Sequence, residues 1–427
     1  MNMNVKKEKI SLSELLNRYF VQSKHATLNM LIFTVICVII SRLIMFVIYA
    51  IWFSGRYSGF FDAISAAWDC GWYKSIINYG YPLEPSGHEN GDAASWAFFP
   101  LSPMIIRFFA SLLKISPLVA GFFVNTLFFI LAMLISYKYI MLTRNNVKLA
   151  VIFILYMSFG PNNFYYSSLY TESLFMLLTV WFLYELTKER YLLMGVSGAL
   201  LSATRVTGVF IVFSVLIYLI YKHLREKQGK FLDFIKNIFS NPKLLLGVCI
   251  VPVGLFAYML YLHLHVGDAL AFTHIQKAWG RSTSDLFDAI KVFFRSGASL
   301  SIGSTSAEAS LRPLTAAIST NISNALVSIY YTVIFIIIIL VTVYTVKKRR
   351  AHESVPYVFP CAINVLTLGF VNISRYSSGT GIFILNLIDV IETKLPKPAK
   401  IAIYSVFIIS SLVLQYMWFD VHFITIG

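Results

Sequence analysis

Charged residues are scarce in this sequence. Only 13% of its 427 residues are Asp, Glu, Lys or Arg, whereas 58% are hydrophobic and the mean hydropathy is +0.72. Soluble globular proteins carry about 25% charged residues. The composition therefore excludes an ordinary soluble domain and indicates a polytopic membrane protein.

Cysteine and nucleotide-binding signatures are also missing. The chain has four cysteines, of which Cys37, Cys249 and Cys361 lie inside apolar runs, and no CxxC spacing occurs. This pattern excludes a disulfide framework and shows no zinc motif. No glycine-rich nucleotide loop is present, which disfavours an enzyme that uses a cytosolic nucleotide sugar.

Long apolar runs are the most prominent feature of the sequence. Runs of about 20 residues, each long enough to cross roughly 30 Å of hydrocarbon, recur without the alternation of a strand. We therefore predict an all-α, polytopic helical membrane protein with about eleven transmembrane helices. The first run, 27–53, is too long and uninterrupted for a cleaved signal peptide.

The net charge of +15 is unevenly distributed along the chain. The N-terminal segment and alternate connections between the apolar runs are basic, whereas the other connections carry roughly equal numbers of acids and bases. By the positive-inside rule, the N-terminus and the basic connections are cytoplasmic, so the charge does not indicate nucleic acid. The basic connections are residues 143–148, 187–190, 221–243, 346–350 and 392–400.

Polar motifs gather in the segments predicted to lie on the outer face, namely 61–100, 166–175, 202–208, 265–281 and 373–379. A charge near the bilayer centre costs about 3 kcal/mol on insertion scales, so Arg42, Glu172 and Arg205 should face a hydrated or protein-lined cavity. Arg205 is expected at the tip of a helical hairpin, because Lys188 and Lys222 are both predicted to lie inside.

This set of residues fits group transfer from a membrane-anchored phosphate. Asp69, in the stretch AWDCGWYKSIINYGYP (67–82), is the candidate general base for a hydroxyl acceptor. Arginines would bind the phosphate through charge-assisted hydrogen bonds. Trp68, Trp72 and Tyr73 would present flat apolar surfaces to sugar rings.

Five motifs in order and spacing carry a family resemblance: AWDCGWYKSIINYGYP, AFFPLSPMI, YTESLF, SATRVTG and GDALAFTHIQKAWGR, with a weaker echo at SRY (374–376). Together they resemble the PIG-V family, the relatives of GPI mannosyltransferase II. Relatives usually have TRPTG where this chain has TRVTG, and often a proline where Ala269 follows Asp268.

The resemblance implies a GT-C glycosyltransferase that moves a hexose, most often mannose, from a polyprenyl-phosphate sugar to a hydroxyl acceptor outside the cytoplasm, with inversion. It implies a single membrane-embedded domain over 1–427, with the motifs in 1–281 and further helices in 282–427. It implies Asp69 as the catalytic base. The donor phosphate sites are then Arg205, Arg42, Arg281 and Arg375, and the other substrate-binding residues are Trp68, Trp72, Tyr73, Glu172, Asp268, Gln276 and Trp279.

Plain structural roles compete with these assignments. Asp69 could be a helix N-cap, and Glu172 could be an acid in the first turn of a helix. Arg205 could form a structural ion pair with Glu172 or Asp268, whereas Arg281 and Arg375 could reach lipid head groups. The His263, His265 and His274 group does not have the spacing of a zinc site.

A second function also fits a polytopic membrane protein, namely transport or flipping of a lipid-linked sugar. That function predicts inverted repeats with ionisable residues at the midplane, and no repeat is evident. The resemblance favours a prokaryotic cell membrane over the endoplasmic reticulum, with a glycolipid or cell-envelope glycan as acceptor. A divalent cation is an open expectation, since arginines alone can neutralise a phosphate leaving group.

Overall fold

The computed structural model describes residues 11–88, 91–226, 231–279, 322–368 and 372–420. Arg281 lies outside these residues. Among them, the only strands are β1 (Ser86–His88) and β2 (Gly91–Ala93), which pair as an antiparallel hairpin. The prediction of an all-α protein is therefore confirmed.

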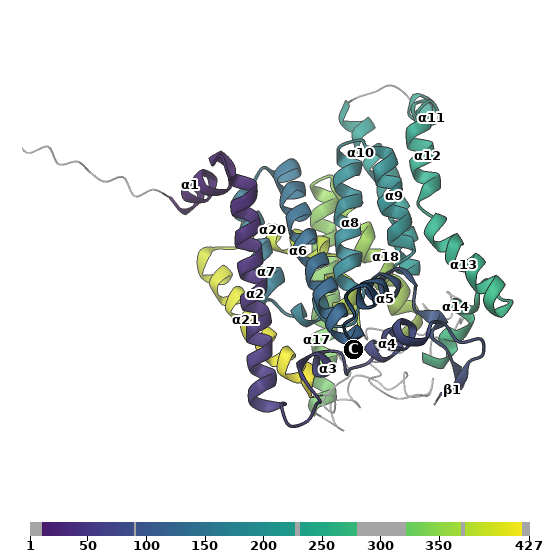
Figure 1. Cartoon of the computed structure of the whole chain (residues 1–427). Helices are drawn as coiled ribbons and strands as arrows, with labels where there is room; N and C mark the ends of the chain where they lie inside the picture. The colour runs from purple at the N-terminus through teal and green to yellow at the C-terminus, as the bar shows by residue number, and fades with distance from the viewer. Residues whose placement is uncertain (1–10, 89–90, 227–230, 280–321, 369–371, 421–427) are drawn as a thin grey trace, which may run out of the picture.

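All other secondary-structure elements of the described residues are helices (Figure 1). The first half contains α1 (Leu12–Asn17), α2 (Ala26–Trp52), α3 (Phe60–Ile64), α4 (Cys70–Tyr79), α5 (Leu101–Leu113), α6 (Pro117–Arg144), α7 (Val147–Phe159), η3 (Asn163–Tyr166), α8 (Glu172–Thr187), α9 (Tyr191–Ser202), η4 (Val206–Ile211) and α10 (Val212–Glu226). The second half contains α11 (Phe231–Phe239), α12 (Pro242–Ile250), α13 (Val253–Val266), α14 (Ala271–His274), η5 (Ile275–Trp279), α17 (Ile322–Lys347), η7 (Ala351–Glu353), α18 (Val355–Leu368), α19 (Ile373–Ser378), α20 (Ile382–Lys394) and α21 (Lys397–Phe419).

Six helical stretches within the described residues are long and apolar enough to cross a membrane. They are Ala26–Trp52, Pro117–Arg144, Val206–Arg225, Pro242–Val266, Tyr330–Lys347 and Lys397–Phe419. Shorter apolar helices accompany them, including α5, α7 and α9. The chain is therefore a polytopic membrane protein, and the count of about eleven spans stays a prediction.

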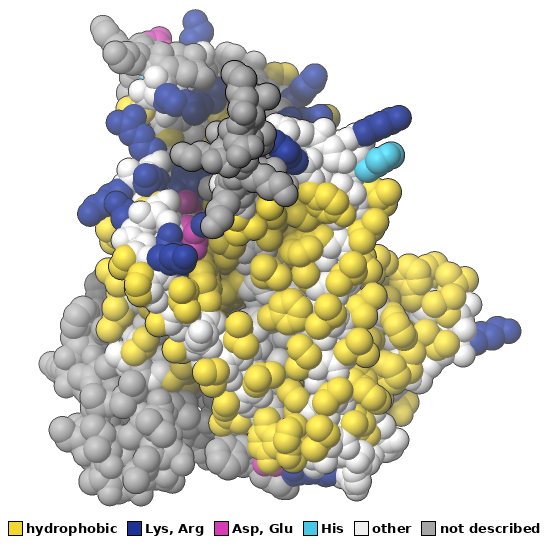
Figure 2. Space-filling view, turned by 90° about the vertical axis from the view of Figure 1, so that its left-hand side faces the viewer, with side chains coloured by type: hydrophobic (Ala, Val, Ile, Leu, Met, Phe, Trp, Pro, Cys, Tyr) yellow, Lys and Arg dark blue, Asp and Glu magenta, His cyan; other side chains and the backbone are white. Residues whose placement is uncertain are grey.

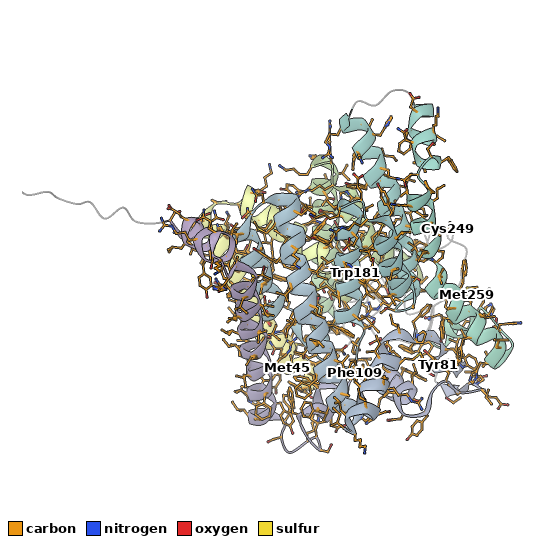
Figure 3. The ribbon with its side chains drawn as sticks, turned by 45° about the horizontal axis from the view of Figure 1, so that its top comes forward. Met45, Tyr81, Phe109, Trp181, Cys249 and Met259 are labelled. Atoms are coloured by element: carbon orange, nitrogen blue, oxygen red, sulfur yellow. The ribbon has the colours of Figure 1, made fainter. Side chains whose placement is uncertain are left out.

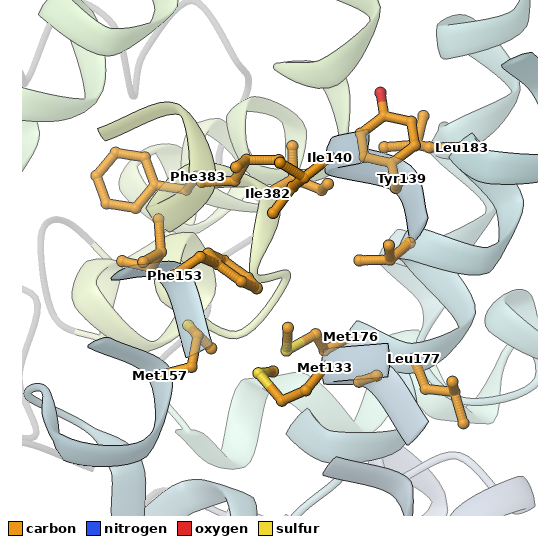
Figure 4. Packing of buried hydrophobic residues seen from close by; sticks show 14 of the residues in the cluster. Met133, Tyr139, Ile140, Phe153, Met157, Met176, Leu177, Leu183, Ile382 and Phe383 are labelled. Atoms are coloured by element: carbon orange, nitrogen blue, oxygen red, sulfur yellow. The ribbon is translucent and has the colours of Figure 1, made fainter. Parts of the chain in front are cut away.

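Helix α8 lies at the centre of the bundle. Almost every residue from Glu172 to Leu186 is buried, so this helix has no lipid-facing or solvent-facing stripe. Its main neighbours are α6 and α9, and Figure 4 shows Met176 beside Met133 of α6 and Leu183 beside Tyr139 of α6. Because α8 is fixed on all sides, the residues at its N-terminus occupy a rigid position.

Close glycine contacts hold α9 against α12 and α13. A Cβ on Gly195 would lie 2.5 Å from the carbonyl oxygen of Gly247, and one on Gly254 would lie 2.0 Å from that of Ala199. Ser202 adds a hydrogen bond from Oγ to the Val251 carbonyl at 2.7 Å. Close backbone approach of this kind is typical of helix pairs in membranes, where lipid removes the hydrophobic drive for association.

The bundle has two chemically different ends. In Figure 1, α11 is at the top, whereas α3, α4 and β1 are at the bottom. Figure 2 shows Lys and Arg side chains gathered above a wide band of hydrophobic ones. Ion pairs tie the basic connections together, including Arg144 with Glu353 at 2.5 Å and Arg350 with Asp389 at 2.6 Å.

The C-terminal helix α21 supports the opposite end. Trp418 donates its indole N–H to the carbonyl of Ile64 at 3.1 Å and packs on Phe164, with ring centroids 4.6 Å apart. Arg56 pairs with Asp420 at 2.7 Å. Helix α21 thereby fixes the segment that leads into Asp69.

Candidate active site

Asp69 lies immediately before α4, in the N-cap position, but its side chain makes no cap hydrogen bond. Its Oδ2 instead accepts a hydrogen bond from Nη1 of Arg375 at 2.6 Å. The preceding residue, Trp68, has φ of 51°, a conformation that is unusual for a tryptophan and concentrates at functional sites. The carboxylate is therefore held for an interaction outside its own helix.

Glu172 is the first residue of α8, as the sequence predicts, and its side chain is only 1% exposed. Its Oε1 accepts hydrogen bonds from Nε of Arg375 at 2.6 Å and from Nη2 of Arg205 at 2.5 Å. The positive end of the helix dipole adds to the stabilisation of this buried carboxylate. Glu172 therefore joins the two arginines.

Arg375 lies in α19 and connects both carboxylates. Besides its bonds to Asp69 and Glu172, its guanidinium stacks over the ring of Tyr170 at 4.2 Å and faces that of Tyr165 at 5.7 Å. Desolvated cation–π contacts are worth about 2 kcal/mol. The guanidinium is thus held from several directions.

Arg205 lies in the turn between α9 and η4, which confirms the predicted hairpin tip. Its Nε donates to Oγ1 of Thr171 at 2.6 Å, and its guanidinium lies over the ring of Phe175 at 5.2 Å. Of the two ion-pair partners considered for Arg205, the structure selects Glu172, because Asp268 bonds elsewhere.

Three ion pairs link these four residues in the order Asp69–Arg375–Glu172–Arg205. We call this group, which has no net charge, the charge cluster. Side-chain exposure falls from 28% at Asp69 to 13% at Arg205, 6% at Arg375 and 1% at Glu172. Burying several ions is costly even when they are paired, so a structural role alone is a weak reason for such a cluster. A buried charge cluster in which one member, here Asp69, is partly exposed marks a candidate functional site.

An aromatic group lies beside this cluster. The rings of Trp72 and Phe98 stack with centroids 5.9 Å apart, and Trp279 meets them edge-on at 5.4 and 5.8 Å. Tyr73 packs against Phe98 at 5.2 Å and experiences the charges of all four members of the cluster. Three predicted substrate residues, Trp72, Tyr73 and Trp279, are thus brought together near Asp69, while Trp68 is 49% exposed.

A second aromatic group extends this surface along α13. Tyr81, which follows α4, packs against Tyr258 and Tyr261, and its carbonyl bonds to the ring of His265 at 3.0 Å. Tyr81 and Met259 belong to the same cluster, and Figure 3 labels both.

Arg42 does not contact the charge cluster. Its Nη1 bonds to Oγ of Ser41 at 3.2 Å and to the Asn163 carbonyl at 3.5 Å, and its guanidinium lies over Phe129 at 5.2 Å. Among the described residues, its Nε and Nη2 have no hydrogen-bond partner. The structure therefore places Arg42 beside η3, separate from Arg205 and Arg375.

Asp268 and Gln276 also do not contact the charge cluster. Asp268 accepts from His274 at 2.7 Å and from the backbone N–H of Leu270 at 2.8 Å. The hydrogen bond from His274 holds the pKa of this carboxyl below its usual value. Gln276 bonds to the carbonyl of Phe272 at 3.3 Å.

Some residues of the site were missed by sequence reasoning. Thr171 fixes Arg205, and Tyr165 and Tyr170 carry the guanidinium of Arg375. Tyr170 is the first residue of YTESLF and Tyr165 lies shortly before it, but no pattern in the sequence says which cation these rings contact. Phe98, in AFFPLSPMI, likewise joins Trp72 only through packing.

No group of three or more His, Cys, Asp or Glu side chains that could hold a metal occurs in the part of the chain that the structure describes. Asp69 and Glu172 are each bonded to arginine, and no third ligand of these types accompanies them there. The described residues therefore offer no ready-made cation site, and a divalent cation stays a prediction.

The family is decided by the match of residues 54–275, just over half of the chain, to the model described as Mannosyltransferase (PIG-V). The chain belongs to the PIG-V mannosyltransferase family. A comparison with curated proteins found no match.

The chain is also similar to solved structures of an oligosaccharyltransferase from Archaeoglobus fulgidus. One is archaeal AglB in complex with an inhibitory peptide and a dolichol-phosphate, at 12% identity and a TM-score of 0.47; the apo form gives 13% and 0.48. Each match covers 94% of this chain and 56% of the other. The chain thus spans little more than half the length of these proteins, and the likeness carries none of the assignments below.

Proposed function

We propose that this PIG-V family member transfers a hexose, with mannose as the family's sugar, from a polyprenyl-phosphate donor to a hydroxyl acceptor. The observation that carries the proposal is the charge cluster of Asp69, Arg375, Glu172 and Arg205, which joins a partly exposed carboxylate to two arginines. Asp69 is the base, and Arg205 and Arg375 hold the donor phosphate.

The reaction is a single displacement at the anomeric carbon. The acceptor hydroxyl gives its proton to Oδ1 of Asp69, to which no described residue donates, while its oxygen bonds to the anomeric carbon. The bond from that carbon to the phosphate oxygen breaks, and its electron pair leaves with the phosphate. The guanidinium groups stabilise the added negative charge. Attack opposite the leaving group inverts the configuration.

The aromatic group supplies the surfaces for sugar binding. Trp72, Phe98 and Trp279 lie next to the charge cluster and present apolar faces of the kind on which sugar rings pack. Trp68 is exposed beside Asp69 and is available to the acceptor. The acceptor in this proposal is a glycolipid or a cell-envelope glycan.

The site is proposed to face away from the cytoplasm. Helix α11, which belongs to a basic connection, lies at one end of the bundle, and α4, which directly follows Asp69, lies at the other (Figure 1). Arg375 bonds to Asp69, and Glu172 links Arg375 to Arg205, which supports placing all three at the α4 end. The positive-inside rule assigns the basic end to the cytoplasm. A lipid-linked donor would enter from the bilayer, and we propose a prokaryotic cell membrane as its place.

The test is transfer by the purified full-length protein in detergent, with radiolabelled polyprenyl-phosphate mannose and an extract of lipid and wall material. We expect label to move to an acceptor with the wild type and with Asp62→Asn, a matched control on α3. Asp69→Asn keeps the side-chain volume but removes the base, so transfer should be lost.

Two other results would contradict the proposal. Near-normal transfer by Asp69→Asn would exclude Asp69 as the general base. No transfer from any polyprenyl-phosphate hexose, together with label crossing liposome bilayers, would indicate a transporter or flippase for lipid-linked sugars. Addition of EDTA tests whether transfer needs a divalent cation. Because two arginines can neutralise the phosphate, we expect transfer to continue in EDTA.

A further inference from the structure

The bond between Asp69 and Arg375 creates a problem for the proposed base. A carboxylate oxygen that accepts a short, charge-assisted hydrogen bond from a guanidinium is held in a fixed place and is partly neutralised. The same guanidinium is one of the two that the donor phosphate needs. Asp69 and the phosphate therefore compete for one N–H group.

The two partners of this bond differ in how firmly they are held. Arg375 is 6% exposed and is anchored away from Asp69 by Glu172 and by the ring of Tyr170. Asp69 is 28% exposed, makes no cap bond in α4, and has no described partner besides Arg375. When the bond breaks, the carboxylate is the partner that moves.

Charge balance favours replacement of Asp69 by the donor phosphate at Arg375. The four residues of the cluster carry two positive and two negative charges, so the second arginine is already neutralised by Glu172. A phosphodiester brings one further negative charge. The phosphodiester cannot bind both guanidinium groups well while Asp69 and Glu172 remain hydrogen-bonded to them.

We propose that the donor phosphate displaces Asp69 from Nη1 of Arg375, so that the base becomes available to the acceptor only after the donor is bound. This inference rests on the proposed function. No covalent bond changes in the step: the hydrogen bond from Nη1 to Oδ2 is replaced by one from Nη1 to a phosphate oxygen. The freed carboxylate then accepts the hydrogen bond of the acceptor hydroxyl, and the donor binds first.

The test reads the carboxylate directly, without turnover. The purified full-length protein is treated with a carbodiimide, with and without polyprenyl phosphate, the donor lipid that lacks a sugar. Modification of Asp69 is measured by mass spectrometry relative to Asp62, which forms no ion pair with an arginine among the described residues. Site–site couplings are commonly worth 5- to 150-fold, so we expect polyprenyl phosphate to raise Asp69 labelling at least about fivefold. Unchanged or reduced labelling would overturn the proposal.

Two variants form a matched pair. Arg375→Gln removes the partner, so Asp69 should be labelled strongly from the start and polyprenyl phosphate should add little. Arg205→Gln leaves the bond from Asp69 to Arg375 in place, so labelling should start low and rise only at higher lipid concentration. If Arg375→Gln does not fold, the wild-type comparison decides alone.

The outcomes separate this inference from the proposed function. Sugar transfer by the wild type without a rise in Asp69 labelling means that the enzyme works but its base is not controlled by the donor. A rise in labelling without transfer to any acceptor means that the phosphate exchange is right and the proposed reaction is wrong.

Discussion

Asp69 and Arg375 are 306 positions apart in the sequence, yet Oδ2 of one and Nη1 of the other lie 2.6 Å apart. Arg375 belongs to a part of the chain outside the stretch 54–275 that matches the family model. The C-terminal helices therefore do more than complete the bundle, because they contribute a guanidinium that contacts both carboxylates of the candidate site.

Arg205→Ala should weaken use of the donor more than turnover. Hydrogen bonds to charged groups are worth about 1.5–3 kcal/mol, and about 1.4 kcal/mol is tenfold, so the KM for polyprenyl-phosphate mannose should rise at least about tenfold. Steady-state kinetics with varied donor check this. Arg190→Ala, at the basic end, is the control and should leave KM unchanged. A normal donor KM for Arg205→Ala would remove Arg205 from the phosphate site.

Glu172→Gln should cost both stability and activity. Glu172 is the shared acceptor of Arg205 and Arg375, and removing one partner of a buried ion pair costs about 3–5 kcal/mol. Thermal unfolding in detergent should show a large fall in Tm, and transfer should be lost. Glu185→Gln, a buried acid near the other end of α8, should keep transfer. Equal loss of transfer in both variants would mean that the effect is only structural.

Gly195→Leu should prevent correct packing of α9 against α12. Even a Cβ at Gly195 would lie 2.5 Å from the carbonyl oxygen of Gly247, and backbone cannot yield as a side chain can. We expect loss of monodisperse protein on size-exclusion chromatography. Gly55→Ala, where a Cβ meets nothing within 4 Å, should behave as the wild type. A well-folded Gly195→Leu would contradict the observed packing.

Glu353 should make stability depend on acid pH. Burial opposes ionisation of this carboxyl, but the charge of Arg144 and its hydrogen bonds outweigh burial and hold the pKa at about 2. A depressed pKa means that the stabilisation is complete above the unfolded value, near 4.5, and is lost as the pH falls toward 2. The Tm difference between the wild type and Glu353→Gln should therefore be constant from pH 7 to 5 and shrink below that. A constant difference down to pH 3 would argue against this linkage.

Sequence reasoning identified several residues that the structure brings together in the candidate site, because the clue to each residue was local. A charge inside an apolar run requires a partner whatever the fold, which identified Glu172 and Arg205. The hairpin at Arg205 followed from the basic residues on either side of it. Arg42 met the same criterion but lies beside η3, since a buried arginine can also be satisfied by carbonyl groups and an aromatic face.

The sequence by itself determined the class of the protein. Scarce charge and long apolar runs leave membrane helices as the stable solution, because a backbone in lipid must satisfy its own hydrogen bonds. The alternation of basic connections predicts which segments share an end of the bundle. Only the tertiary structure decided that Arg375 bridges Asp69 and Glu172, because that choice depends on how α19 packs beside α4 and α8. No local pattern carries information about a contact across 306 positions.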